Sequence, residues 1–138
     1  MLKNPYLDIP YSPDLMTFVG RLDIYDREDT LGEELWSLDP NDAEDRDVII
    51  RKYILRRIGR YTYRHKYLLV EKLKECIEDS RYDFSQYFLH DPEEYNSLAW
   101  DETEIDTPRS FMERVYEIAK EEWKGDLEKA SLEDQSTW

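Results

Sequence analysis

Apolar residues that recur at helical spacing are the feature that most restricts the fold of this chain. Residues three or four positions apart lie on one face of an α-helix, so each such stripe predicts an amphipathic helix with one buried side. Three stripes predict core helices near residues 42–58, 65–79 and 108–124. The stripes consist of Ile50, Ile54 and Ile58, of Leu69, Leu73 and Ile77, and of Met112, Val115, Ala119 and Trp123.

Prolines that follow a capping side chain mark where helices begin. A side-chain oxygen before a proline at the first helical position is a common start signal. This pattern occurs at Ser12-Pro13, Asp39-Pro40, Asp91-Pro92 and Thr107-Pro108. The chain therefore predicts shorter helices at 83–89 and 92–100 besides the three core helices.

Glycines indicate where helices end. Gly59 predicts a break or kink between the first two core helices, with one helix running through to residue 79 as the alternative. Gly125 predicts the end of the helix at 108–124. Beyond it, the polar tail 126–138 either frays or brings Trp138 back onto the body.

The expected fold is a mainly α-helical single-domain bundle of about five or six helices. Residues 15–25 form either a helix stopped at Gly20 or an arrangement with a strand at 21–25, which leaves a short strand or hairpin near the N-terminus open. A chain of 138 residues buries roughly two-thirds of its unfolded surface and needs no metal or disulfide to fold.

The same composition indicates a cytoplasmic protein without a membrane segment. No apolar run approaches the roughly 20 residues needed to cross a bilayer. The single cysteine, Cys76, lies in an apolar helical pattern and is expected in the core. A chain without an internal disulfide suits a reducing compartment.

Charge divides the chain into three blocks. Residues 1–50 carry a net charge of −9, residues 51–74 carry +8, and residues 75–138 carry −13, which leaves −14 for the whole chain. The basic block interleaves cations with Tyr53, Tyr61, Tyr63 and Tyr67, which could hold phosphates and stack bases. Since a field of this sign repels a polyanion, we instead expect the basic block to pack against the acidic ends of the chain.

Signals of enzymatic chemistry are absent from the sequence. Two histidines 25 positions apart, His65 and His90, and one distant cysteine give no zinc-ligand spacing. His65 is expected at the surface, and His90 beside a helix cap. Four glycines form no phosphate-binding loop, and the acidic run 101–106 lacks the spacing of a calcium loop. We therefore expect no enzyme, no cofactor and no metal.

The group of residues that points to a function combines acidic and aromatic side chains. Large aromatic side chains anchor protein interfaces, and carboxylates around them attract a basic partner. The segment 90–106 combines these features, and a second cluster at 23–36 resembles it and includes Trp36. The predicted partner-binding residues are Glu93, Glu94, Tyr95, Trp100, Asp101, Glu102, Glu104 and Asp106. The alternative is that the aromatic residues are core anchors and the acids are ordinary surface.

Three classes of function compete on these grounds. The first is an inhibitor or antitoxin-like immunity protein that covers a basic partner such as a toxin nuclease, with nucleic-acid mimicry as one mode. The second is a nucleic-acid-binding regulator that uses the basic segment 51–67. The third is a small carboxylate or metal-dependent enzyme. The overall acidity favours the first and makes direct nucleic-acid binding the weaker prediction.

Overall fold

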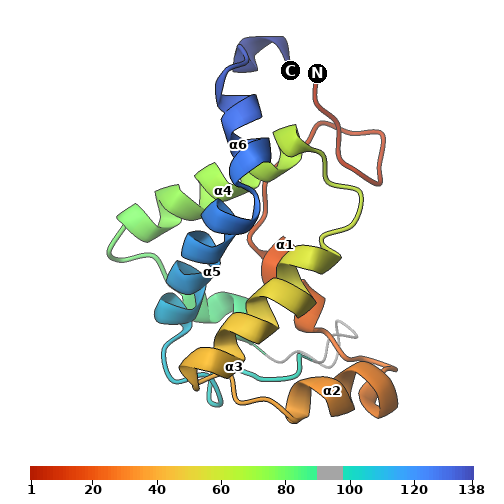
Figure 1. Ribbon diagram of the computed structural model, residues 1–138, viewed down its shortest axis with the longest axis vertical. Helices are drawn as coiled ribbons and strands as arrows, with labels where there is room; N and C mark the ends of the chain where they lie inside the picture. Colours follow the sequence, from red (N-terminus) through yellow and green to blue (C-terminus); the bar gives the residue numbers. More distant parts are fainter. Residues whose placement is uncertain (90–97) are drawn as a thin grey trace.

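The computed structural model describes residues 1–89 and 98–138, and these residues are mainly helical (Figure 1). Six α-helices are present in the described part of the chain, as the sequence predicts. They are α1 (Met16–Val19), α2 (Glu33–Trp36), α3 (Ala43–Val48), α4 (Tyr63–Glu78), α5 (Pro108–Glu122) and α6 (Lys124–Ser131).

Shorter helical turns of other types connect them. The 3₁₀ turns are η1 (Gly20–Leu22), η4 (Leu55–Arg57), η5 (Phe84–Phe88) and η7 (Gln135–Thr137). Two segments are π-helical, η2 (Glu28–Gly32) and η3 (Ile49–Ile54). The predicted short helix at 83–89 is thus a 3₁₀ turn, capped by the Asp83 carboxylate. The predicted helix at 92–100 lies mostly outside the described residues.

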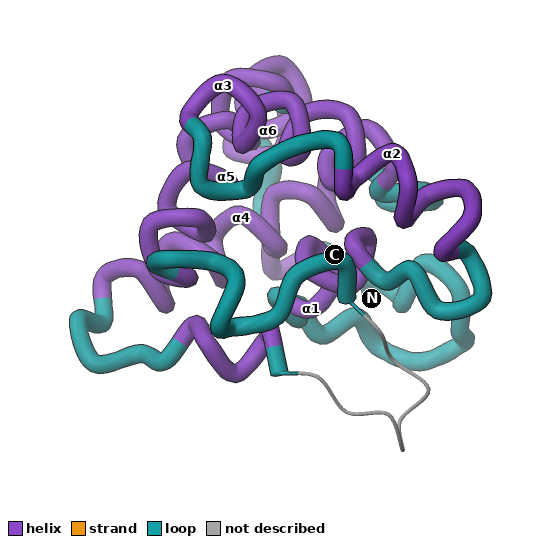
Figure 2. Tube along the Cα trace, turned by 90° about the horizontal axis from the view of Figure 1, so that it is seen from below, coloured by secondary structure: helices purple, strands orange, loops and turns teal. Residues whose placement is uncertain are grey.

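One continuous cluster of buried side chains joins these elements. The three predicted stripes point into it, and Ile50, Leu69 and Val115 are fully buried. Phe88 of η5 meets Phe111 of α5 edge to face, with ring centroids 5.8 Å apart. Cys76 is also buried, as its apolar surroundings predict. Helix α4 packs against both α5 and α6, and the two termini lie near each other in both views of the trace (Figures 1 and 2).

The chain from 43 to 78 contains two helical segments rather than one. α3 continues through η3 into η4, which ends at Arg57, and α4 begins at Tyr63. Between them Gly59 has φ +82°, a left-handed conformation that other residues rarely adopt. A Cβ at this position would also collide with the Tyr6 hydroxyl. The predicted break at Gly59 is therefore confirmed.

His65 was expected at the surface, and that prediction is wrong. The residue is 5% exposed. Its Nδ1 accepts a hydrogen bond from the Thr62 backbone N–H at 3.1 Å, so its Nε2 carries the proton and donates to the Lys3 carbonyl at 2.6 Å. His65 lies four residues before Leu69 on the apolar stripe of α4, and that spacing was the signal for burial.

The C-terminal tail folds back onto the body. Gly125 does not end the helical run, because only a local irregularity at Trp123 separates α5 from α6. The Trp138 indole N–H donates to Glu133 at 3.1 Å, and its ring packs against Arg64 and Tyr67. These contacts correspond to the alternative in which Trp138 returns onto the body.

The described residues near the N-terminus contain isolated bridges instead of a strand. One antiparallel bridge pairs Lys3 with Pro10, and another pairs Asp23 with Leu98. Pro10 has no N–H to extend the first pairing, and the Asn4 side chain accepts from the backbone N–H groups of Tyr6 and Leu7, which turns the chain. Residues 16–22 form α1 and η1, so of the two alternatives for residues 15–25 the helix that stops at Gly20 is present and the strand at 21–25 is not.

The basic block packs against the acidic C-terminal region, as expected from the charge pattern. Five ion pairs join the two over the described residues, at N···O distances of 2.8 to 3.2 Å. They are Arg51–Glu121, Arg51–Glu122, Arg56–Glu122, Arg64–Glu133 and Lys66–Asp126. The Glu122 carboxylate accepts from both Arg51 and Arg56, and these hydrogen bonds hold its pKa below the usual range.

We predict that Glu122→Gln lowers the free energy of unfolding by about 1 kcal/mol at pH 7, since it removes a shared, mostly buried carboxylate. The depressed pKa of Glu122 means that its contribution is present above the unfolded-state pKa and disappears as the pH falls through the folded-state pKa. Urea denaturation at pH 7 and pH 3 should show a smaller difference in stability between Glu122→Gln and the original protein at pH 3 than at pH 7.

The matched control is Glu121→Gln, because Glu121 pairs with Arg51 alone and its side chain is 69% exposed. Glu121→Gln should lower the free energy of unfolding by less than half as much as Glu122→Gln. Equal losses of stability for the two variants would show that the pairing of Glu122 with two arginines stabilises the fold no more than a single exposed ion pair does.

Candidate protein-binding surface

The predicted binding residues have three different placements. Glu93, Glu94 and Tyr95 lie outside the described residues. Trp100 is in the core with 5% exposure, so its ring is covered by the fold in the way the alternative interpretation proposed. The other four acids, Asp101, Glu102, Glu104 and Asp106, lie in one turn at the surface, where the first two are half-buried and the last two exposed.

Asn41 holds this turn against the start of α3. Its side-chain amide donates to the Glu104 carbonyl at 2.9 Å and accepts from the Asp106 backbone N–H at 3.0 Å. Both hydrogen bonds join segments more than 60 residues apart in the sequence. One asparagine therefore places the acidic turn 101–106 beside the acidic segment 39–45.

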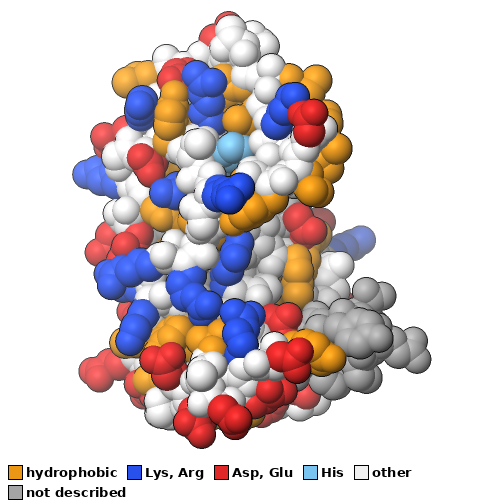
Figure 3. All heavy atoms as spheres, turned by 90° about the vertical axis from the view of Figure 1, so that its right-hand side faces the viewer, with side chains coloured by type: hydrophobic (Ala, Val, Ile, Leu, Met, Phe, Trp, Pro, Cys, Tyr) orange, Lys and Arg blue, Asp and Glu red, His pale blue; other side chains and the backbone are white. Residues whose placement is uncertain are grey.

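The joined segments form what we call the acidic surface. It consists of Asp39, Asp42, Glu44, Asp101, Glu102, Glu104 and Asp106. Figure 3 shows Asp and Glu side chains gathered at the lower end of the molecule, whereas Lys and Arg side chains gather across the middle of the same face. The acidic surface therefore lies at one end of this face, next to the cations across its middle.

Several of these carboxylates also hold the local backbone. Asp42 caps α3 by accepting from the Asp45 N–H at 3.0 Å, and Asp101 accepts from the Thr103 N–H at 2.9 Å. Glu102 differs, because its Oε2 is buried and has no hydrogen bond to a described residue.

Trp36 is the exposed aromatic residue beside the acidic turn. Its side chain is 52% exposed, and its indole N–H donates to the Ala99 carbonyl at 3.0 Å. The ring lies over Gly32, where an added Cβ would come within 3.4 Å of it. The bridge between Asp23 and Leu98 joins the same two regions. The two acidic-aromatic clusters of the sequence are therefore neighbours. Trp36, rather than Trp100, is the exposed indole beside the acidic turn.

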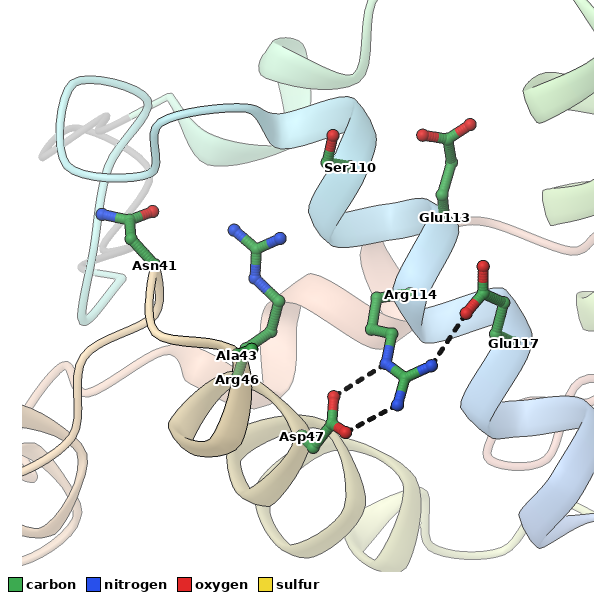
Figure 4. Close-up of a pocket in the computed structure, with 8 residues that line it drawn as sticks. All are labelled: Asn41, Ala43, Arg46, Asp47, Ser110, Glu113, Arg114 and Glu117. Carbon is green, nitrogen blue, oxygen red and sulfur yellow. Dashed lines mark hydrogen bonds and ion pairs between the residues drawn. The ribbon is translucent and has the colours of Figure 1, made fainter.

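A cleft of about 490 Å³ between α3 and α5 adjoins the acidic surface (Figure 4). Asn41 lines this cleft and also holds the acidic turn 101–106. On one side of the cleft the Arg114 guanidinium binds both oxygens of Asp47, at 2.8 and 2.6 Å, and also Glu117 at 2.8 Å. These hydrogen bonds raise the pKa of Arg114 and lower that of Asp47. The pairing fixes the spacing of the two helices.

Arg46 occupies the other side of this cleft. Its Nε donates to the Pro40 carbonyl at 2.8 Å, and its guanidinium lies 5.5 Å from the centre of the buried Phe111 ring. Burial lowers the pKa of Arg46, while Asp106, Asp47 and Asp39 oppose this shift. No carboxylate of the described residues lies within ion-pair distance of it. The guanidinium has N–H groups to offer to an acceptor in the cleft, such as a peptide carbonyl.

The described residues contain no group of three or more His, Cys, Asp or Glu side chains that could hold a metal ion. The arrangement fits recognition of another surface: exposed carboxylates, one exposed indole and a polar cleft. The sequence did not reveal Asn41 or Trp36 as central, because their importance depends on contacts across more than 60 residues.

We predict that Asn41→Ala releases the turn 101–106 and lowers the free energy of unfolding by about 1 kcal/mol, since it replaces two exposed protein hydrogen bonds by hydrogen bonds to water. Hydrogen exchange should accelerate at the Asp106 amide. Ser110→Ala, which also removes a polar side chain from the same cleft, should leave that amide unaffected. Unchanged exchange at Asp106 in the Asn41 variant would contradict the assigned role.

No family model, curated protein or solved structure matches this chain. Among the described residues, none of the helices combines the length and the apolar composition needed to cross a membrane.

Proposed function

We propose that this chain is an acidic protein-binding module that inhibits a basic partner, as an immunity protein neutralises a toxin nuclease. The observation that carries the proposal is the acidic surface, which Asn41 assembles from two distant segments beside the exposed Trp36. A cytoplasmic site of action belongs to the same proposal.

Each part of the surface has a role in such binding. The net charge of −14 attracts a basic protein over a distance of about one Debye length and speeds its association. Trp36 supplies apolar contact area at low entropic cost, since hydrogen bonding to Ala99 already restricts its ring. Exposed Glu44 and Asp106 can pair with Lys and Arg of the partner, and so can the second oxygen of Glu104, whose Oε1 accepts from the Asp101 N–H at 3.2 Å.

The competing functions have less support. A nucleic-acid regulator would use the segment 51–67, but Arg51, Arg56, Arg64 and Lys66 are already paired with carboxylates of the same chain. A carboxylate enzyme would need acids that converge on a substrate, and two of the three acids that line the cleft, Asp47 and Glu117, are tied to Arg114. Nucleic-acid mimicry remains one mode of the proposed inhibition, in which the carboxylates occupy phosphate positions.

The test uses two variants with equal changes in charge. Triple substitution of Glu44, Glu104 and Asp106 by Lys reverses the acidic surface, and triple substitution of Glu71, Glu75 and Glu78 by Lys makes the same change on the exposed side of α4. The partner is first isolated by capture at low salt and then purified. Affinities and association rates are measured with the purified pair.

We predict that the first variant binds at least about tenfold more weakly, mainly through slower association. The α4 variant should stay within about threefold of the original protein. Association of the original protein should slow as salt rises. Equal losses for both variants would reduce the interaction to net charge and overturn the assignment of the acidic surface.

A further inference from the structure

A second candidate site consists of cations that have no carboxylate partner among residues 1–89 and 98–138. Arg27, Lys52 and Arg57 line one groove of about 370 Å³ between η2 and the η3–η4 segment. All three are exposed. Thr30 and Glu34 complete its polar edge, and the buried Leu31 and Tyr53 form apolar parts of the lining. The groove thus holds three cations and one carboxylate in a chain with 33 acids and 19 bases.

Neighbouring cations of the same segment differ from those of the groove, because they do pair with carboxylates. Arg51 and Arg56 pair with Glu122, whereas Lys52 and Arg57, each one residue further along the chain, have no carboxylate of the described residues within 4.0 Å. Lys52 lies over the Tyr53 ring, with its Nζ 5.2 Å from the ring centre. Arg27 uses one N–H to bond the Asp23 carbonyl at 2.8 Å, which orients its guanidinium.

The backbone of the groove is unusual on both sides. η2 contributes Thr30 and Leu31, and η3 contributes Lys52 and Tyr53, and both segments are π-helical. π-helical residues are rare and occur frequently at functional sites. The π-helical turns and the unpaired cations are independent observations, and they coincide in one groove.

We propose that this groove binds a small phosphate ester, of about the size of a nucleotide. Guanidinium groups favour phosphate because their paired N–H donors match its oxygens. The volume is near the lower end for small-molecule sites. The acidic field of the whole molecule disfavours a long polyanion, and Glu34 is placed to accept from a hydroxyl or amino group of the ligand. The site is separate from the proposed protein-binding function and survives if that proposal fails.

The experiment is an NMR titration of the full chain with three probes: inorganic phosphate, adenosine 5′-monophosphate and a single-stranded oligonucleotide of ten thymidines. We expect saturable shifts for the mononucleotide at backbone amides of 27–34 and 52–57, with weaker binding of inorganic phosphate at the same amides. Absence of saturable binding by all three probes would overturn the proposal. Tighter binding of the oligonucleotide in the groove would also overturn it, in favour of a nucleic-acid site.

The matched variants are Arg57→Gln and Arg56→Gln, which change the same charge at adjacent exposed positions of η4. Only Arg57 lines the groove. Arg57→Gln should weaken mononucleotide binding about tenfold, while Arg56→Gln should change it less than twofold. Thermal unfolding checks that both variants are folded. Equal weakening by the two changes would show a diffuse charge effect and refute the groove as the site.

Discussion

The pairing of the basic segment with the C-terminal carboxylates is the interaction on which the rest of this structure depends. A chain of net charge −14 repels itself when compact, and the basic stretch between two acidic blocks offsets that repulsion. Arg51, Arg56, Arg64 and Lys66 reach α5, α6 and Glu133. These contacts bring the end of the chain onto its middle, and apolar packing of α4 against α5 and α6 then has a fixed geometry.

Acids that take no part in these pairs remain exposed over much of the described chain, among them Glu71, Glu75 and Glu78 on α4. The turn 101–106 and the segment 39–45 bring a further group of exposed acids together at one end of the molecule (Figure 3). Asn41 is decisive there, since it converts two acidic stretches into one surface through two backbone contacts. The proposed protein-binding role follows from this assembled surface rather than from the acidity of the chain alone.

Local patterns predicted the helices well, and long-range contacts account for what they missed. The stripes at 50–58, 69–77 and 112–123 and the break at Gly59 depend on interactions within a few residues, which the sequence displays directly. The burial of His65 was also available from its spacing to Leu69, but its basic neighbours suggested a surface position. By contrast, the choice of Trp36 over Trp100 as the exposed indole depends on how residues 98–100 enter the core, and no local pattern records that.

The π-helical segment η3 has a consequence for how this sequence tolerates change. A π-helical turn contains an additional residue relative to an α-helix, and one residue corresponds to a rotation of about 100° around the helix axis. Because the wider turn absorbs its extra residue, the side chains on either side of η3 keep the faces that a regular α-helix would give them. Deleting one residue between 49 and 54 would therefore convert η3 into a regular α-helical turn and leave Arg56 facing Glu122 and Arg57 in the groove. Deleting one residue from a regular helix such as α4 would instead rotate every following side chain by about 100°.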